Sequence, residues 1–204
     1  VGLESVQKKA LPHKTTIDDF FNDTEIIRRE YSKLINNNEP NRITLIPSVS
    51  YGMANITNNI NLAGKEVVIA AEQFPSNVYP WMTAARQQGG KLVIVDPPQS
   101  TEHRGEKWNA LILDAINSNT AVLAISHAHW ADGTRFDLVA MRKRTQDVGA
   151  LLIIDGTQTV GAYPFDVEEI KPDALICAGY KWLLGPYGLG LAYYGEFFDD
   201  GRPI

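Results

Sequence analysis

The sequence predicts an α/β fold in three layers, αβα, with a mainly parallel seven-stranded sheet between two layers of helices. From residue 43 onwards, short apolar segments alternate with longer amphipathic segments, as in right-handed βαβ units. The apolar segments are continuous, which is typical of strands buried on both faces. In addition, 204 residues with 44% hydrophobic side chains are enough for one sizeable core.

Each element follows from a local pattern in the chain. Apolar runs rich in β-branched residues predict strands at 43–47, 66–71, 92–95, 121–126, 151–154, 174–178 and 189–193. The amphipathic stretches between them predict helices at about 50–61, 77–88, 106–117 and 137–148. The connection around 185–188 is too short for a helical crossover, so one of the last two strands should run antiparallel to its neighbours.

The N-terminal part of the chain differs from this alternation. Residues 18–38 are polar, with acidic side chains first and Arg28, Arg29 and Lys33 later, the order that a helix dipole favours. We therefore expect residues 1–42 to be a helical lead-in and residues 43–204 to be the large domain. Because the sequence ends in a turn-like segment, we also expect a C-terminal small domain that this chain lacks.

Composition limits the classes of partner. The net charge of −5 and the dispersed Lys and Arg residues do not favour nucleic acid. No apolar run approaches the ~20 residues of a membrane helix, and the N-terminus lacks a signal-peptide pattern, so we expect a cytoplasmic protein. The single cysteine, Cys177, excludes an internal disulfide within this sequence.

The strongest chemical signal is a carboxylate and a lysine that each follow a buried strand. Asp155 ends one apolar run, and a buried carboxylate needs a partner. Lys181 follows another apolar run, and lysine is rarely buried without a function. Together they can hold pyridoxal 5′-phosphate, Lys181 through a Schiff base and Asp155 beside the pyridine nitrogen. Taken singly, Asp155 can cap a turn, and Lys181 can extend its head to water.

Other candidate cofactor-binding residues follow the expected strands, at the edge where ligands bind to open α/β sheets. Ser50 and Tyr51 open a helix and can cradle a phosphate, or the serines there can be ordinary caps. Phe74 can stack on a cofactor ring or fill the core. Asn77 can reach a polar cofactor atom or cap the next helix.

Further candidates lie beside the later strands. His129 or Trp130 can contact a cofactor oxygen or the substrate, or the polar groups of this loop can bond only to backbone. No third ligand follows the two histidines at a spacing typical of zinc sites, so no metal is expected. Gln158 can donate to the ring hydroxyl, Thr157 can pack on the ring face opposite the phenylalanine, and Tyr180 can donate to the phosphate.

These motifs occur in an order that resembles the class V aminotransferase family of pyridoxal-phosphate enzymes. The matching motifs are Asp-Gly-Thr-Gln at 155–158, Tyr-Lys at 180–181 and Gly-Pro-Tyr-Gly at 185–188. The family includes cysteine desulfurases, selenocysteine lyases, kynureninases and isopenicillin-N-epimerase-like proteins. The resemblance spans about residues 43–195 and implies the large domain of a fold type I transferase.

The resemblance also implies roles for individual residues. Lys181 corresponds to the Schiff-base lysine and proton shuttle, Asp155 to the pyridinium partner, and Gln158 to the donor to the ring oxygen. The phosphate ligands are, by the same resemblance, Ser50, the Tyr51 backbone and Tyr180. Position 178 is Ala where many relatives carry a Ser or Thr phosphate ligand, and Trp130 stands where desulfurases often have Asn.

The function implied is that of a transferase or lyase acting at the α- or β-carbon of an amino acid through an external aldimine. Aminotransferase and cysteine desulfurase or selenocysteine lyase chemistry are the first alternatives. A kynureninase-like hydrolase or an isopenicillin-N-epimerase-like enzyme stays open, because residues 74–77 are similar to the kynureninase stacking loop. A non-catalytic scaffold of the same fold is the alternative from another class. Family members usually form homodimers, so a homodimer is expected here.

Overall fold

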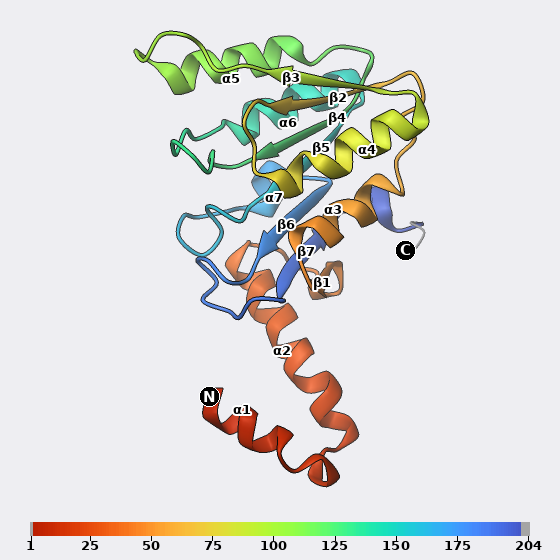
Figure 1. The fold of residues 1–204 in the computed structure, drawn as a ribbon, viewed down its shortest axis with the longest axis vertical. Coiled ribbons are helices and arrows are strands. Elements are labelled where there is room, and N and C mark those ends of the chain that lie inside the picture. Colours follow the sequence, from red (N-terminus) through yellow and green to blue (C-terminus); the bar gives the residue numbers. More distant parts are fainter. Residues whose placement is uncertain (1, 201–204) are drawn as a thin grey trace.

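The computed structural model describes residues 2–200 as a seven-stranded sheet with helices on both faces, preceded by a helical extension (Figure 1). The strands are β1 (Ile43–Ile46), β2 (Glu66–Ala70), β3 (Lys91–Val95), β4 (Thr120–Ser126), β5 (Leu151–Asp155), β6 (Ala174–Ala178) and β7 (Gly190–Tyr194). The helices are α1 (Gly2–Lys9), α2 (Ile17–Leu34), α3 (Val49–Thr57), α4 (Tyr79–Gln88), α5 (Arg104–Ala115), α6 (Leu138–Val148) and α7 (Val167–Ile170). Four short 3-10 turns lie at Pro12–Lys14, Pro40–Arg42, Pro75–Asn77 and Glu196–Phe198.

The sheet confirms the predicted αβα class. Its strand order is β1-β7-β6-β5-β4-β2-β3. The pairs among β2 to β6 are parallel, whereas β7 runs antiparallel to both β6 and β1. The short connection before β7 produces this reversal, as the sequence predicts. The carboxyl ends of β2, β4, β5 and β6 therefore meet at one edge of the sheet.

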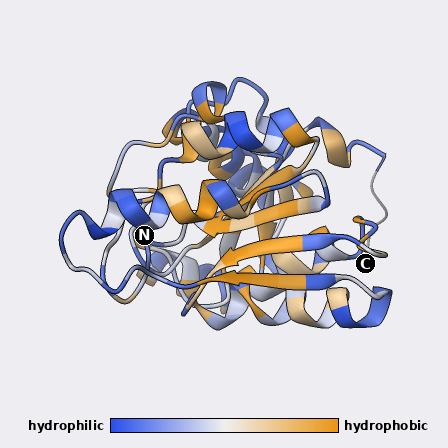
Figure 2. Ribbon diagram, turned by 90° about the horizontal axis from the view of Figure 1, so that it is seen from above, coloured by the Kyte–Doolittle hydropathy of each residue, from blue (hydrophilic) through white to orange (hydrophobic). Residues whose placement is uncertain are grey.

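Two apolar cores lie on the two faces of the sheet. One core joins the sheet to α2, α5, α6 and α7, and its largest fully buried side chain is Trp108. The other joins the sheet to α3 and α4 and contains the buried Trp81. Neighbouring strand residues such as Val67 and Val68 point to opposite cores, which is why the strands are apolar on both faces. Figure 2 shows this apolar character concentrated in the strands.

Helix α2 contributes to the core through its C-terminal half. Tyr31 and Ile35, at 3% and 0% exposure, are buried beside the sheet, whereas α1 and the first turns of α2 extend away from it (Figure 1). The division into a lead-in of residues 1–42 and a domain of residues 43–204 stays a prediction, and its residues 201–204 lie outside the described part.

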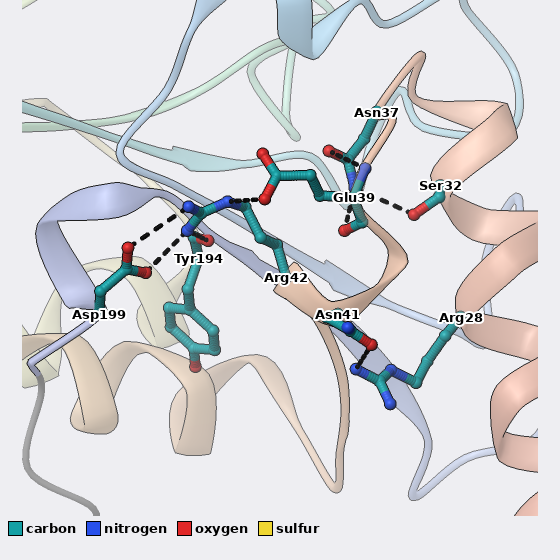
Figure 3. A network of polar contacts seen from close by, with 8 residues as sticks. All are labelled: Arg28, Ser32, Asn37, Glu39, Asn41, Arg42, Tyr194 and Asp199. Atoms are coloured by element: carbon teal, nitrogen blue, oxygen red, sulfur yellow. Dashed lines mark hydrogen bonds and ion pairs between the residues drawn. The ribbon is translucent and has the colours of Figure 1, made fainter.

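Polar contacts connect this lead-in to the edge of the sheet (Figure 3). Arg42 pairs with Glu39 at 3.2 Å and with Asp199, beyond β7, at 2.8 Å. Arg28 Nε of α2 donates to the carbonyl of Ile43 in β1 at 2.8 Å. The segment before β1 is thus held from both sides, by α2 and by the residues after β7.

The helix boundaries differ from the expected ones by a few residues. Helix α3 ends at Thr57 instead of about 61, and α4 begins at Tyr79 because Pro75–Asn77 form a 3-10 turn. The four-residue α7 is absent from the prediction because so short a segment carries too little periodicity. None of the helices within residues 2–200 combines the length and apolar character needed to cross a membrane.

The turn after β5 requires glycine at position 156. A Cβ there would lie 2.7 Å from Cys177 Sγ and 2.8 Å from Val160 Cγ2. We expect Gly156→Ala to lower the free energy of unfolding by about 1–3 kcal/mol, as overpacking does, measured by urea denaturation of the full-length protein. Gly105→Ala is the control, since its Cβ would meet only Thr134 at 3.6 Å. Equal stability of the two variants would contradict this account.

Candidate active site

A cavity of about 230 Å³ lies at the edge where the parallel strands end. Its walls come from the start of α3, the loop after β2, the segment after β4, the turn after β5 and the loop between β6 and β7. Seven predicted site residues line it: Ser50, Phe74, Asp155, Thr157, Gln158, Tyr180 and Lys181. The sequence prediction therefore converges on one place in the fold.

Asp155 is a buried carboxylate in the wall of this cavity. Its side chain is 6% exposed, and Oδ1 accepts a hydrogen bond from the Thr157 backbone N–H at 3.0 Å. Burial raises the pKa of Asp155, while the hydrogen bonds from Thr157 and the charge of Lys181 oppose that rise. A carboxylate in this position favours a cationic or N–H-bearing ligand in the cavity.

The turn that carries Asp155 is fixed to the next strand. Thr157 Oγ1 accepts a hydrogen bond from the Ala178 N–H at 3.0 Å, and Gly156 N–H donates to the Ile176 carbonyl at 2.9 Å. The Thr157 hydroxyl oxygen thus holds the end of β6, and the Thr157 side chain also lines the cavity. These bonds fix the carboxylate relative to the segment that leads to Lys181.

Lys181 and Phe74 face each other across the cavity. Lys181 Nζ lies 5.6 Å from the centroid of the Phe74 ring, within the range of a cation–π contact. Phe74 is 41% exposed, so it is a wall of the cavity and not a core side chain. Tyr180 and Tyr187, which also line the cavity, stack with ring centroids 4.4 Å apart. The cavity that contains the amine is thus lined by aromatic rings.

Three predicted residues lie outside the cavity lining. Ser48 caps α3 by accepting from the Tyr51 N–H at 3.2 Å, so the backbone donor predicted at Tyr51 is already engaged. Asn77 is fully buried, and it donates to Gln73 at 2.9 Å and accepts from Trp81 at 3.1 Å. Its side chain connects the loop after β2 to α4.

His129 is the third of these residues. Its Nε2 lies 3.1 Å from the Glu72 carbonyl oxygen, and its ring packs on Trp108 with centroids 5.1 Å apart. Extended backbone alternates its side chains, so Ser126, Ala128 and Trp130 line the cavity while both histidines point away from it. This alternation is a signal that the sequence offered and that would have favoured Trp130.

Gln73 and Ser126 also line the cavity and were not predicted. Gln73 Nε2 donates to the Ala124 carbonyl at 2.9 Å, so its amide bridges the ends of β2 and β4. Nothing in the local sequence distinguishes this glutamine from a solvent-exposed one, whereas Ser126 is the last residue of a predicted strand.

The remaining polar residues near the site do not form a second centre. Cys177 is 1% exposed, accepts a hydrogen bond from the Tyr31 hydroxyl at 3.1 Å, and has a pKa raised by burial, so it is a neutral thiol. His127 packs against Tyr163 and Phe165, and burial lowers its pKa to about 4. Within residues 2–200, no three His, Cys, Asp or Glu residues are grouped to hold a metal ion.

A comparison with known protein families concerns the chain as a whole. The family model of aminotransferase class-V matches residues 9–198, which is most of the chain. The chain belongs to the class V aminotransferase family. It is 28% identical over 178 residues to an uncharacterized aminotransferase, YcbU, of Bacillus subtilis (strain 168), covering 87% of this chain and 46% of the relative.

Two further comparisons are with proteins whose names refer to sulfur chemistry. The chain is 27% identical to a cysteine desulfurase of Escherichia coli O7:K1, over 88% of this chain and 44% of that protein. It shares its fold with the cystine C–S lyase C-DES, at a TM-score of 0.82, 19% identity, and coverage of 98% of this chain and 55% of C-DES. The chain thus spans about half the length of these relatives.

Proposed function

We propose that this chain is the cofactor-binding part of a pyridoxal-phosphate-dependent transferase or lyase that acts on an amino acid. The observation that carries the proposal is the convergence of Lys181, buried Asp155 and Phe74 on one cavity. The relatives support it, since one structure of C-DES holds glycine covalently linked to the PLP cofactor. The match over about half of each relative supports the division into this large domain and a further small domain.

The residues around the cavity fit this cofactor on chemical grounds. The Asp155 carboxylate, whose pKa is raised by burial, gains a compensating charge from a protonated pyridine nitrogen. Phe74 and Thr157 offer an apolar face and a methyl-bearing wall for a planar ring. Ser50, exposed at the start of α3, and Tyr180 offer hydroxyls, and the helix start offers a positive dipole end for a phosphate.

Bound pyridoxal phosphate supplies an aldehyde that condenses with amines and a ring that accepts the electron pair released at a substrate carbon. Lys181 provides the primary amine that would attach the cofactor, and the free amine would carry protons to and from the substrate carbon. Asp155 would hold the proton at the pyridine nitrogen, and Gln158 would donate to the ring oxygen. The Phe74 ring, 5.6 Å from Lys181 Nζ, restricts water around the amine.

The names of the relatives favour sulfur removal from a cysteine-like substrate or transamination. The sequence of the loop at 74–77 keeps a kynureninase-like hydrolysis as the second candidate. Cys177 is buried and hydrogen-bonded to Tyr31, so it is not placed to act as a nucleophile in either reaction. Assays of the full-length protein for sulfide, for amino-group transfer to a keto acid, and for kynurenine cleavage separate these reactions.

We further propose that the enzyme is a cytoplasmic homodimer, as the family resemblance implies. The aromatic residues beyond Lys181 support a protein contact there, because Trp182 is 52% exposed and Tyr187 is 83% exposed. Sedimentation of the full-length protein should give the mass of two chains. A monomer at micromolar concentration would contradict the proposal.

Trapping of the cofactor tests the proposed function directly. We expect the full-length protein incubated with pyridoxal phosphate to show a visible absorption band that borohydride removes. Peptide mass spectrometry should then find the reduced cofactor on Lys181. A protein that takes up no cofactor, or fixes it on a lysine outside the cavity, would overturn the proposed function.

A further inference from the structure

The loop after β2 that presents Phe74 begins with a strained residue. Glu72 has a φ of +54°, in the left-handed region that residues with a Cβ seldom adopt. Its side chain is exposed, so the carboxylate does not enforce this conformation. The contacts that stabilise it must therefore be made to its backbone.

Two ring nitrogens from the segment after β4 meet the Glu72 carbonyl. Trp130 Nε1–H donates to this oxygen at 2.7 Å, and His129 Nε2 lies 3.1 Å from it and 3.3 Å from the Ala71 carbonyl. Carbonyl oxygens only accept, so His129 carries a proton on Nε2 and donates it. One backbone oxygen thus receives two side-chain donors that are adjacent in sequence.

The histidine of this pair is anchored in the core. Its side chain is 3% exposed, and its ring packs on Trp108, which is fully buried and donates to the Val95 carbonyl at 3.0 Å. On its other side, His129 Nδ1 lies 3.3 Å from Asp132 Oδ1. His129 therefore ties the position of the Glu72 carbonyl to the core of the fold, so the loop alone does not determine it.

Trp130, which donates to the Glu72 carbonyl, also contacts Phe74 in the cavity wall. Its ring meets the Phe74 ring edge to face, with centroids 5.8 Å apart and an interplanar angle of 82°. Phe74 in turn lies under Lys181 Nζ at 5.6 Å. Since Phe74 is 41% exposed, core packing alone does not fix its orientation.

We propose that His129 and Trp130 are positioning residues that hold the Glu72 carbonyl and the edge of Phe74, and thereby orient the Phe74 ring toward Lys181 and the cofactor. This inference rests on the proposed function for the identity of the cofactor. The geometry of the support concerns only this chain's own residues. It assigns to His129 an indirect role in place of the direct contact that the sequence suggested.

The test compares Trp130→Phe and His129→Phe with Glu72→Ala in the full-length protein. Trp130→Phe keeps an aromatic edge but loses the indole donor, and His129→Phe keeps a ring against Trp108 but loses the Nε2 donor. Glu72→Ala is the matched control, because it removes the exposed side chain and leaves the carbonyl in place. We measure the dissociation constant of pyridoxal phosphate, the visible circular dichroism of the bound cofactor and hydrogen exchange at residues 72–74 without cofactor.

Loss of either donor should weaken cofactor binding about fivefold, the effect of one hydrogen bond, and reduce the visible dichroism. Exchange at residues 72–74 of the cofactor-free protein should accelerate by a similar factor, while Glu72→Ala behaves as the parent. A double-mutant cycle with Phe74→Leu separates indirect from direct action. If Trp130 acts through Phe74, Trp130→Phe should have little further effect on cofactor binding in the Phe74→Leu background.

Three results would overturn the proposal. Trp130→Phe and His129→Phe with parental exchange at residues 72–74 would show that the carbonyl needs neither donor. Lower thermal stability with unchanged cofactor affinity and dichroism would leave only a structural role. An undiminished effect of Trp130→Phe in the Phe74→Leu background would mean direct contact with the ligand. If the parent binds no cofactor, the proposed function fails, and the exchange measurement alone decides whether the donors hold the loop.

Discussion

Replacing Lys181 with alanine should lower the turnover of the full-length enzyme by at least about 10³-fold, because one side chain provides both covalent attachment and proton transfer. Among the described residues that line the cavity, Lys181 carries the only primary amine of a side chain. The borohydride-reducible absorption band should disappear with it. The measurements are kcat with the substrate identified by the assays above and the visible spectrum of the purified variant.

The control is Lys143→Ala, which removes an exposed amine from α6 on the surface of the protein. Its turnover should stay within about twofold of the parent, as surface substitutions have small effects. A small primary amine added to the Lys181→Ala protein should restore part of the proton transfer. If the Lys181→Ala protein kept the absorption band and a turnover within tenfold of the parent, another group would attach the cofactor.

The fold was predictable because its signals are local and repeated. Continuous apolar runs such as the one at 151–154 have one interpretation when helical patterns separate them, and the short link at 185–188 requires a reversal. The C-terminal end of α2 was harder to predict, since Tyr31 and Ile35 are buried while other apolar side chains of the helix, such as Phe20 and Phe21, are exposed. Their burial depends on where the helix packs against the sheet, which is set by the tertiary structure and not by the local sequence pattern.

The site was predictable as far as strand ends determine it. Asp155 and Lys181 follow buried strands, and parallel strands bring such positions together without any further information. Asn77 and His129 have the same kind of sequence context, yet their partners are Trp81 and the Glu72 carbonyl. Loop side chains point toward or away from a cavity according to backbone geometry, which the order of residues alone does not determine.

We expect the Asp155 carboxylate to destabilise the cofactor-free protein at neutral pH. Asp155→Asn should therefore raise the free energy of unfolding of that form. Burial raises the pKa of this carboxyl above its unfolded value, so the native state binds more protons than the unfolded state between the two values. The contribution of Asp155 to stability is then present at low pH and is lost as the pH rises through the folded pKa. Asparagine keeps an acceptor for the Thr157 N–H and has no charge to bury.

We expect Asp155→Asn to be more stable than the parent without cofactor and less stable than the parent with cofactor. Without cofactor, Asp155→Asn should unfold at higher urea concentration than the parent at pH 7.5, and the difference should shrink toward pH 4, whereas the exposed control Asp96→Asn should show no such trend. With pyridoxal phosphate the order should reverse, because the cofactor stabilises the parent more, and turnover of the variant should fall roughly 10²- to 10³-fold. A parent that is the more stable protein at neutral pH without cofactor would mean that a partner within the chain already compensates the carboxylate. The reversal would instead identify the compensating charge as one that arrives with the ligand, which is the property that makes a buried aspartate useful in this cavity.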